Sequence, residues 1–246
     1  MGLGPFVRRM FGPYEHRITE LYRNFFVDLD EFADRLKIWV PEPARILEVG
    51  CGEGALTERL VGIYPDARIT AVDISPRVGR LFRGDTKRVS FLNQPIERLI
   101  RDRPKAFDLI VLCDVLHHVA VAVRRQFLAS IGEAMAPEAY LVLKDWEPSF
   151  TAIHLTWFLA DRFVTGDRVS FWTEAEIRGW LEEGLGSGCV RAQARIRPRW
   201  NNLAFLVRPP ADWRGVRKIG KTSTQPENSH SRWNAETTTW RIPGSQ

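Results

Sequence analysis

The chain has 246 residues, of which 44% are hydrophobic and 26% are charged, values typical of an ordinary globular protein. This length suits one α/β domain with accessory segments and is short for two independent catalytic domains. No apolar run approaches the roughly 20 residues that a membrane-spanning helix needs, so the sequence excludes a membrane span.

The net charge of +5 is concentrated near the C-terminus. Residues 209–246 contain six Lys or Arg and three Asp or Glu side chains, a net charge of +3 out of the total of +5. The rest of the chain is close to neutral. This distribution does not favour a nucleic acid as the partner of the folded domain.

Cysteine usage and the N-terminus indicate the cellular compartment. Cys51, Cys113 and Cys189 are odd in number and widely spaced, which fits neither a disulfide framework nor a zinc site. Arg8 and Arg9 are not followed by the apolar stretch of a secretion signal. The sequence therefore predicts a cytoplasmic protein without a bound metal.

Residues 1–43 are predicted to be helical. Apolar side chains recur there at intervals of three to four positions, until Pro41 and Pro43 end the pattern. We expect this segment to form a helical lid.

Residues 44–208 are predicted to form a doubly wound α/β domain. Short runs of Ile, Val and Leu alternate with helical patterns, as in a buried parallel sheet with crossover helices. A short polar connection between the last two runs indicates an antiparallel C-terminal hairpin. The predicted strands are Arg45–Val49, Arg68–Val72, Val89–Leu92, Phe107–Leu112, Ala139–Lys144, Val190–Ile196 and Leu203–Val207.

Two further segments differ from this pattern. Residues 146–180 are rich in aromatic side chains and are predicted to be an insertion that covers the site, with Thr173 and Glu176 as a capping box opening a helix. Residues 209–246 lack apolar periodicity and are rich in Thr, Ser, Asn, Gln and Pro, so we expect a disordered tail.

The first strand runs into a glycine-rich turn. Gly50, Gly52 and Gly54 follow it directly and precede a helical pattern, an order typical of nucleotide-type cofactor sites. Glycine lets the backbone adopt positive φ and lets a ligand approach closely. A tight turn that binds nothing is the alternative.

Asp73 ends the second strand, about 20 residues beyond the glycines, where nucleotide-binding folds place a ribose-binding carboxylate. Ile74 would then offer an apolar face to adenine. The alternative is that Asp73 caps the structure that follows it.

Three segments together resemble the class I methyltransferases that use S-adenosylmethionine, particularly those acting on quinones and natural products. They are residues 46–54 (ILEVGCGEG), 71–75 (AVDIS) and 107–119 (FDLIVLCDVLHHV). The resemblance implies a Rossmann-like fold and S-adenosylmethionine as the cofactor. NAD would favour a G-x-G-x-x-G spacing instead.

The resemblance also implies which residues bind the cofactor. Glu48 and the glycine turn would face its methionine part, Asp73 the ribose, and the backbone near Cys113 the amino group. The short acidic motif usual after the third strand is replaced here by Asn93-Gln94-Pro95-Ile96, where the Gln94 side-chain oxygen can substitute for the carboxylate. The full predicted set is Glu48, Gly50, Cys51, Gly52, Gly54, Asp73, Ile74, Gln94, Pro95, Ile96, Cys113 and Asp114.

The predicted reaction is methyl transfer to an oxygen of a small hydrophobic or aromatic acceptor. A hydroxyl acceptor needs a base, and His118, Asp145 and His154 are the candidates. His118 can instead belong to the turn after the fourth strand. Two other functions remain open, a non-catalytic cofactor-binding scaffold and an RNA or protein methyltransferase anchored by the basic tail.

Overall fold

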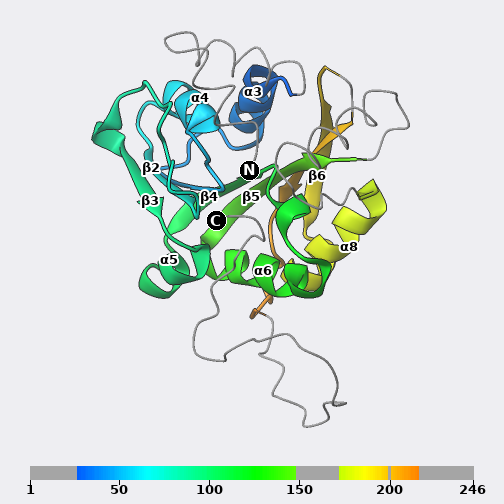
Figure 1. The fold of residues 1–246 in the computed structure, drawn as a ribbon. Coiled ribbons are helices and arrows are strands. Elements are labelled where there is room, and N and C mark those ends of the chain that lie inside the picture. Colours follow the sequence, from blue (N-terminus) through cyan, green and yellow to red (C-terminus); the bar gives the residue numbers. More distant parts are fainter. Residues whose placement is uncertain (1–26, 148–171, 199–200, 216–246) are drawn as a thin grey trace, which may run out of the picture.

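The computed structural model describes residues 27–147, 172–198 and 201–215. A seven-stranded sheet crosses the molecule in the order β3-β2-β1-β4-β5-β7-β6 (Figure 1). β1 to β5 are parallel, and β7 and β6 add an antiparallel hairpin. The strands are β1 (Arg45–Val49), β2 (Arg68–Asp73), β3 (Val89–Asn93), β4 (Phe107–Cys113), β5 (Met135–Trp146), β6 (Val190–Ile196) and β7 (Asn202–Val207).

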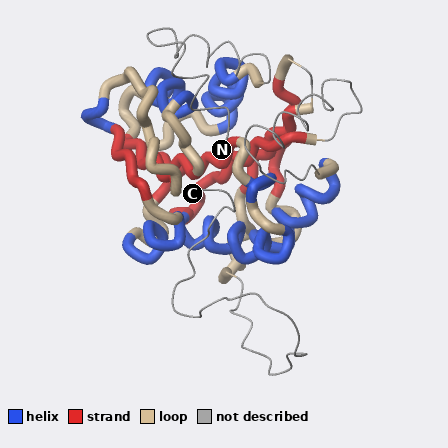
Figure 2. The backbone as a smooth tube through the Cα atoms, in the orientation of Figure 1, coloured by secondary structure: helices blue, strands red, loops and turns tan. Residues whose placement is uncertain are grey.

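Helices cover both faces of this sheet. One face carries α3 and α4, and the other carries α5, α6 and α8 (Figures 1 and 2). The doubly wound α/β fold and its terminal hairpin are therefore confirmed. Among the described residues, no helix is long and apolar enough to cross a membrane. The helices are α3 (Leu29–Trp39), α4 (Ala55–Ile63), α5 (Ile96–Asp102), α6 (Val121–Ala134) and α8 (Glu174–Leu185).

Six of the seven predicted strands agree with the structure to within one residue at each end. The prediction for β5 was wrong at its start, because the strand begins at Met135 and not at Ala139. Met135 pairs with Phe107, and the register then shifts before Tyr140 pairs with Leu109. The irregularity lies at Pro137, which has no amide hydrogen to donate, and at Glu138, which has φ +66°. Because proline is unusual inside a strand, the sequence pattern did not predict the first residues of β5.

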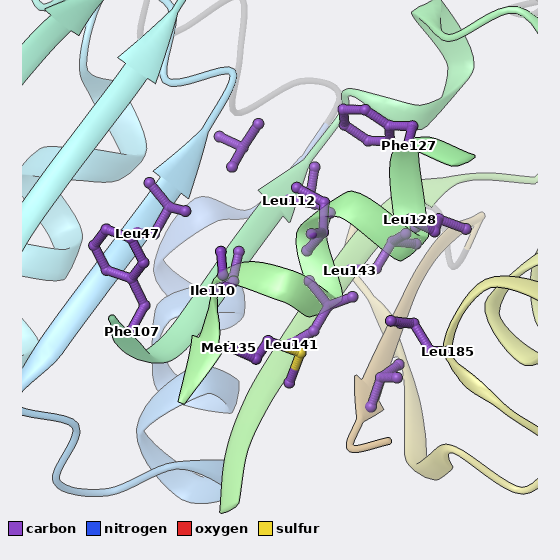
Figure 3. Close-up of a cluster of buried hydrophobic side chains, with 14 of the residues drawn as sticks. Leu47, Phe107, Ile110, Leu112, Phe127, Leu128, Met135, Leu141, Leu143 and Leu185 are labelled. Carbon is purple, nitrogen blue, oxygen red and sulfur yellow. The ribbon is translucent and has the colours of Figure 1, made fainter. Parts of the chain in front are cut away.

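Apolar side chains pack on both faces of the central strands. Toward α6 and α8, side chains from β4 and β5 meet helical residues in one cluster, whose members include Ile110, Leu112, Leu141, Leu143, Phe127, Leu128 and Leu185 (Figure 3). A second cluster joins the opposite face to α3 and α4 through Phe32, Leu36 and Leu60. Burial on both faces explains why these strands are continuous apolar runs in the sequence.

Two helix starts follow from local sequence. The Asp28 side chain accepts a hydrogen bond from the Glu31 amide (2.9 Å) and caps α3. Thr173 and Glu176 form the predicted capping box of α8, which is confirmed. Residues 1–26, the larger part of the expected lid, and residues 148–171 of the expected insertion lie outside the described residues.

The expectation that everything beyond residue 208 is disordered was wrong for Trp213. Its indole packs against the cluster between α6 and α8, and its Nε1 donates to the Gly184 carbonyl (3.2 Å). Gly132 on α6 leaves the space for the ring, because a Cβ there would overlap the indole. The sequence did not predict this packing because the neighbours of Trp213 in the chain are polar. A buried tryptophan needs both apolar contacts and an acceptor for its N–H, and Trp213 has both.

Replacing Trp213 with alanine should lower the free energy of unfolding by about 2 kcal/mol, because a large side chain leaves a cavity and the Gly184 carbonyl loses a donor. Urea denaturation monitored by circular dichroism measures the change. Arg214→Ala, which alters an exposed neighbour, is the control and should change stability by less than about 0.5 kcal/mol. Equal effects of the two substitutions would contradict the packing role of Trp213.

Candidate active site

The predicted cofactor residues meet at one edge of the sheet. Parallel strands present their carboxyl ends together, and β2, β1 and β4 are direct neighbours. The ends align in register, since Val49 pairs with both Val72 and Leu112. The glycine turn, Asp73 and Cys113 therefore lie side by side, at the edge where open α/β sheets bind their ligands.

Backbone geometry explains the three glycines of the turn. Gly50, Gly52 and Gly54 have φ values of +74°, +52° and +97°, which residues with a Cβ rarely adopt. A Cβ at Gly50 would overlap the Val115 side chain. A Cβ at Gly52 would meet nothing within 4 Å, so this part of the turn presents bare backbone to open space.

Asp73 ties this turn to the second strand. One carboxylate oxygen accepts the Gly52 amide hydrogen (2.8 Å) and the other accepts that of Ser75 (2.7 Å). The Asp73 carboxylate therefore caps the turn that follows it, which was the alternative to ribose binding. Each oxygen has two lone pairs, so these bonds leave capacity for a ligand hydroxyl. Ile74 is 41% exposed, unusual for an isoleucine beside a buried strand.

Glu48 places a carboxyl group beneath the turn. It is buried, and the Thr57 hydroxyl of α4 donates to it (2.6 Å). Burial raises the pKa of Glu48 to about 8, against the lowering effect of the Thr57 hydrogen bond, and the charge of Asp73 raises it further. A cationic group beside the turn would restore the charged form.

The edge beyond β3 contains a residue that the sequence analysis missed. The Gln94 backbone amide donates to the Asp73 carbonyl (3.1 Å), Pro95 occupies the N-cap position of α5, and the Ile96 side chain is buried. Glu97 follows, and within the described part of the chain neither of its two buried carboxylate oxygens has a hydrogen-bond partner beyond its own backbone. Burial raises the pKa of Glu97. The only sequence signal for it was an acidic residue in the first turn of the helix.

Asp114, after β4, is held by a second missed residue. Lys144 is fully buried in β5 and donates to both Asp114 oxygens (2.7 and 2.9 Å). This pair fixes Asp114 at φ +58°, a conformation uncommon for a residue other than glycine. Burial raises the pKa of Cys51 and Cys113, so both thiols stay protonated at neutral pH and make no nucleophile.

Asp145 lies at the end of β5 and binds His117. His117 Nδ1 lies 2.7 Å from one Asp145 oxygen, and the His117 amide donates to the other (3.1 Å). Burial opposes the charge on both groups, but their mutual attraction and hydrogen bond outweigh it, which raises the pKa of His117 and lowers that of Asp145. His117 is therefore the polar partner of Asp145. The sequence analysis had not included His117 among the site residues.

The other two candidates for a base are placed differently. The His118 ring reaches solvent and lies 4.1 Å from the His117 ring. The protein atoms around it, and then the neighbouring His117, lower the pKa of His118 to about 4, so it is neutral at pH 7. His154 lies outside the described residues.

Asp114, His117 and Asp145 also have the types and spacing of metal ligands, with ligand atoms within 4.8 Å of one another. Both carboxylates already have partners, however, since Lys144 binds Asp114 and His117 binds Asp145. A cation here would have to displace both pairs, so these contacts balance the charge without an ion.

This fold and the site at its carboxyl edge define a methyltransferase of the Rossmann-like class. The profile of the family described as "Methyltransferase domain" matches residues 14–184, and the chain belongs to this family.

Relatives share much of the chain. It is 36% identical over 192 residues to a ubiquinone biosynthesis O-methyltransferase of Xylella fastidiosa, covering 74% of each protein. It is 29% identical over 125 residues to a malonyl-[acyl-carrier protein] O-methyltransferase of Halalkalibacterium halodurans, which spans 48% of this chain and 45% of that one.

Solved structures share the fold at low sequence identity. The 1,6-didemethyltoxoflavin-N1-methyltransferase of Burkholderia thailandensis, solved with its substrate and S-adenosylhomocysteine, has a TM-score of 0.59 at 20% identity, over 84% of this chain and 88% of the other. Human N-acetylserotonin methyltransferase with S-adenosylmethionine has a TM-score of 0.55 at 19% identity, over 74% and 50%.

The chain is therefore an S-adenosylmethionine-dependent methyltransferase acting on small molecules. This finding argues against the alternatives of a non-catalytic scaffold and of an RNA or protein methyltransferase. The residues present fit the cofactor. Gly52 leaves open space beside the turn, Ile74 offers an exposed apolar side chain, and the buried Glu48 is matched to a cationic group.

Gly50→Ala should lower the free energy of unfolding by about 2 kcal/mol or more, because the new Cβ combines a left-handed backbone with an overlap on Val115. It should also weaken S-adenosylhomocysteine binding. Thermal unfolding and calorimetric titration measure the two effects. The matched variant Gly62→Ala, on the exposed side of α4, should keep the affinity and raise stability slightly. Equal behaviour of the two variants would argue against a strained turn.

Proposed function

We propose that this enzyme transfers the methyl group of S-adenosylmethionine to a hydroxyl oxygen of a small hydrophobic or aromatic metabolite. The observation that supports an oxygen acceptor is the His117–Asp145 pair at the carboxyl edge of β4 and β5. This pair holds an oriented imidazole at the edge where open α/β sheets bind ligands, and imidazole is the side chain that most often accepts a proton near neutral pH.

The cofactor would be held by the residues that surround the ends of β1 to β4. Asp73 would accept hydrogen bonds from the ribose, Ile74 would cover adenine, and Gln94 and Glu97 are the polar groups closest along the chain to the adenine edge. Glu48 and the open backbone at Gly52 would face the methionine part. The buried, unpartnered Glu97 carboxylate supports this arrangement, since an amino group of the ligand would satisfy it.

The bound cofactor supplies an electrophilic methyl group on a sulfonium. The S–CH₃ bond breaks, an O–CH₃ bond forms, the sulfur keeps the electron pair, and the acceptor's hydroxyl proton must leave. His117 is the group that we assign to take that proton. Asp145 orients the ring through Nδ1 and stabilises the imidazolium, which leaves Nε2 to face the acceptor.

This assignment gives Asp145 a positioning role. Three N–H groups lie within hydrogen-bonding distance of its carboxylate, those of His117 Nδ1, the His117 amide and the Trp146 amide, and its pKa is lowered. A carboxylate so well solvated by protein donors is a weak base. His118, with a pKa of about 4, would hold a proton poorly.

A screen with tritiated S-adenosylmethionine tests the proposed function. The panel contains phenols, polyketides and lipidic quinols, each paired with the analogue that bears an amine in place of the hydroxyl. We expect label in the hydroxyl compounds. Transfer confined to amines or to carbon would contradict an oxygen acceptor while leaving the methyltransferase class intact.

Asp73→Ala should weaken S-adenosylmethionine binding at least about tenfold, because charge-assisted hydrogen bonds to the ribose are lost and the Gly52 amide loses its anchor. Calorimetric titration and melting temperature are measured on the same protein. Asp85→Ala, which removes an exposed carboxylate that caps a 3₁₀ turn, is the control for loss of a cap alone. An unchanged dissociation constant with a lowered melting temperature would remove Asp73 from the site.

Asp145→Asn should shift the pH profile of kcat/KM to lower pH. Neutral His117 is the active form, so the wild-type rate should rise through a pKa above the ordinary value of about 6.5. Without the carboxylate, burial dominates and should bring that pKa below 6.5, with a lower kcat because the ring is less well oriented. Initial rates with one phenolic acceptor across pH measure this. An unmoved midpoint would contradict His117 as the base.

A further inference from the structure

Arg124, the fourth residue of α6, is a buried cation without an anionic partner. The residue is 1% exposed, and it is the largest of the fully buried side chains among the described residues. Its Nε donates to the Val119 carbonyl (2.7 Å), which fixes the direction of the guanidinium. Within residues 27–147, 172–198 and 201–215, no carboxylate forms an ion pair with it, and one terminal nitrogen, NH1, has no hydrogen-bond partner.

Two tryptophans enclose this guanidinium. Its carbon lies 4.2 Å from the ring centre of Trp172 and 4.4 Å from that of Trp180. The two indoles meet edge to face, with centres 4.8 Å apart. Their π faces stabilise the cation in part but offer no oxygen acceptor to its N–H groups. Trp172 Nε1 is itself buried, so two donors are buried here for which the described residues provide no acceptor.

The two carboxylates whose charges act on Arg124 already have hydrogen-bond partners. Burial lowers the pKa of Arg124, while the charges of Asp145 and Glu176 raise it from a distance. Asp145 is bound to His117, and Glu176 accepts hydrogen bonds from the amide and the hydroxyl of Thr173. Neither satisfies the free donor of Arg124. Buried polar groups are nearly always paired, so the arrangement calls for an acceptor that the described residues do not supply.

The position of Arg124 indicates which ligand could supply the missing hydrogen-bond acceptor. α6 begins three residues after the 3₁₀ turn Leu116–His118, which contains the proposed base. The charge of Asp145, at the end of β5, reaches the guanidinium. Arg124 therefore belongs to the acceptor side of the site, on the face of the sheet that carries α6 and α8 (Figure 1). The cofactor residues after β1, β2 and β3 lie on the other side of β4.

We propose that Arg124 and Trp172 form an anion subsite that binds a carboxylate of the methyl acceptor. This inference rests on the proposed function, because it places the carboxylate beside the His117–Asp145 pair that would deprotonate the hydroxyl. The acceptor is accordingly a hydroxylated aromatic or hydrophobic acid. The carboxylate serves as an anchor and is not itself methylated.

The chemistry of the two donors matches this ligand. A guanidinium presents its N–H groups in a planar fork that suits the two oxygens of a carboxylate, and the bond to Val119 leaves that fork oriented. The indole N–H of Trp172 adds a third donor. The flanking rings would pack against an aromatic acid. A neutral carbonyl oxygen at the same place would accept hydrogen bonds from the guanidinium but would form no ion pair with it.

Binding of matched probes tests the subsite without requiring turnover. 4-Hydroxybenzoate and 6-hydroxy-2-naphthoate are compared with their neutral carboxamides, by calorimetric titration of the wild-type protein saturated with S-adenosylhomocysteine. We expect at least one acid to bind about tenfold or more tightly than its amide. Arg124→Met should abolish this preference. Arg125→Met, which changes the exposed neighbour on the same helix, should retain it.

Arg124→Lys is a second variant for the case in which Arg124→Met does not fold. Lysine keeps the positive charge but lacks the planar, two-pronged guanidinium. The lysine variant should show a reduced preference for the acid at unchanged S-adenosylhomocysteine affinity. Equal binding of acids and amides by the wild-type protein, or an Arg125→Met effect as large as that of Arg124→Met, would overturn the subsite. Acid preference in a protein that methylates only amines would instead retain the subsite and overturn the oxygen acceptor.

Discussion

The parallel pairing of β1 with β2 on one side and β4 on the other is the constraint on which the site depends. It brings the ends of these strands into register, so Val49, Val72 and Leu112 lie level and the segments after them must meet. Apolar burial on both faces stabilises this order of strands. The glycine turn can then be held by Asp73 across more than twenty positions of sequence, through a hydrogen bond to the Gly52 amide.

Buried charged side chains form two pairs at the carboxyl ends of β4 and β5. Lys144 and Asp145 are consecutive in β5, so their side chains leave opposite faces of the sheet. One meets Asp114 and the other meets His117, and each pair compensates charges that burial would otherwise make costly. Arg124 differs from both pairs, because among the described residues no carboxylate forms an ion pair with it and two indole rings lie beside its guanidinium. We therefore assign Lys144, Asp114, Asp145 and His117 to internal ion pairs and propose a ligand as the partner of Arg124.

The proposed function assigns a different ligand to each side of this edge. Residues after β1, β2 and β3 present glycine backbone, a ribose-type carboxylate and an exposed Ile74, which suit a nucleoside. Residues from β4, β5, α6 and α8 present an imidazole, a guanidinium and tryptophan rings, which suit an aromatic acid. Methyl transfer requires the two ligands to meet in line, and the boundary between β1 and β4 is where the two sets of side chains adjoin.

The sequence by itself determined the order and type of the elements, since hydrophobic periodicity and glycine placement are local properties. It placed six strands to within one residue, and the family resemblance identified the cofactor. The roles that the resemblance gives to the glycine turn and to Asp73 stay predictions. The sequence analysis missed the start of β5, where Pro137 interrupts the pattern, and the packing of Trp213. Only the tertiary structure showed that Lys144 pairs with Asp114 and that His117 pairs with Asp145. It also showed that Arg124 NH1 and the Glu97 carboxylate oxygens are buried without hydrogen-bond partners among the described residues. Such pairings join residues on different strands and helices, and their energies depend on burial and distance, which no local pattern of residues records.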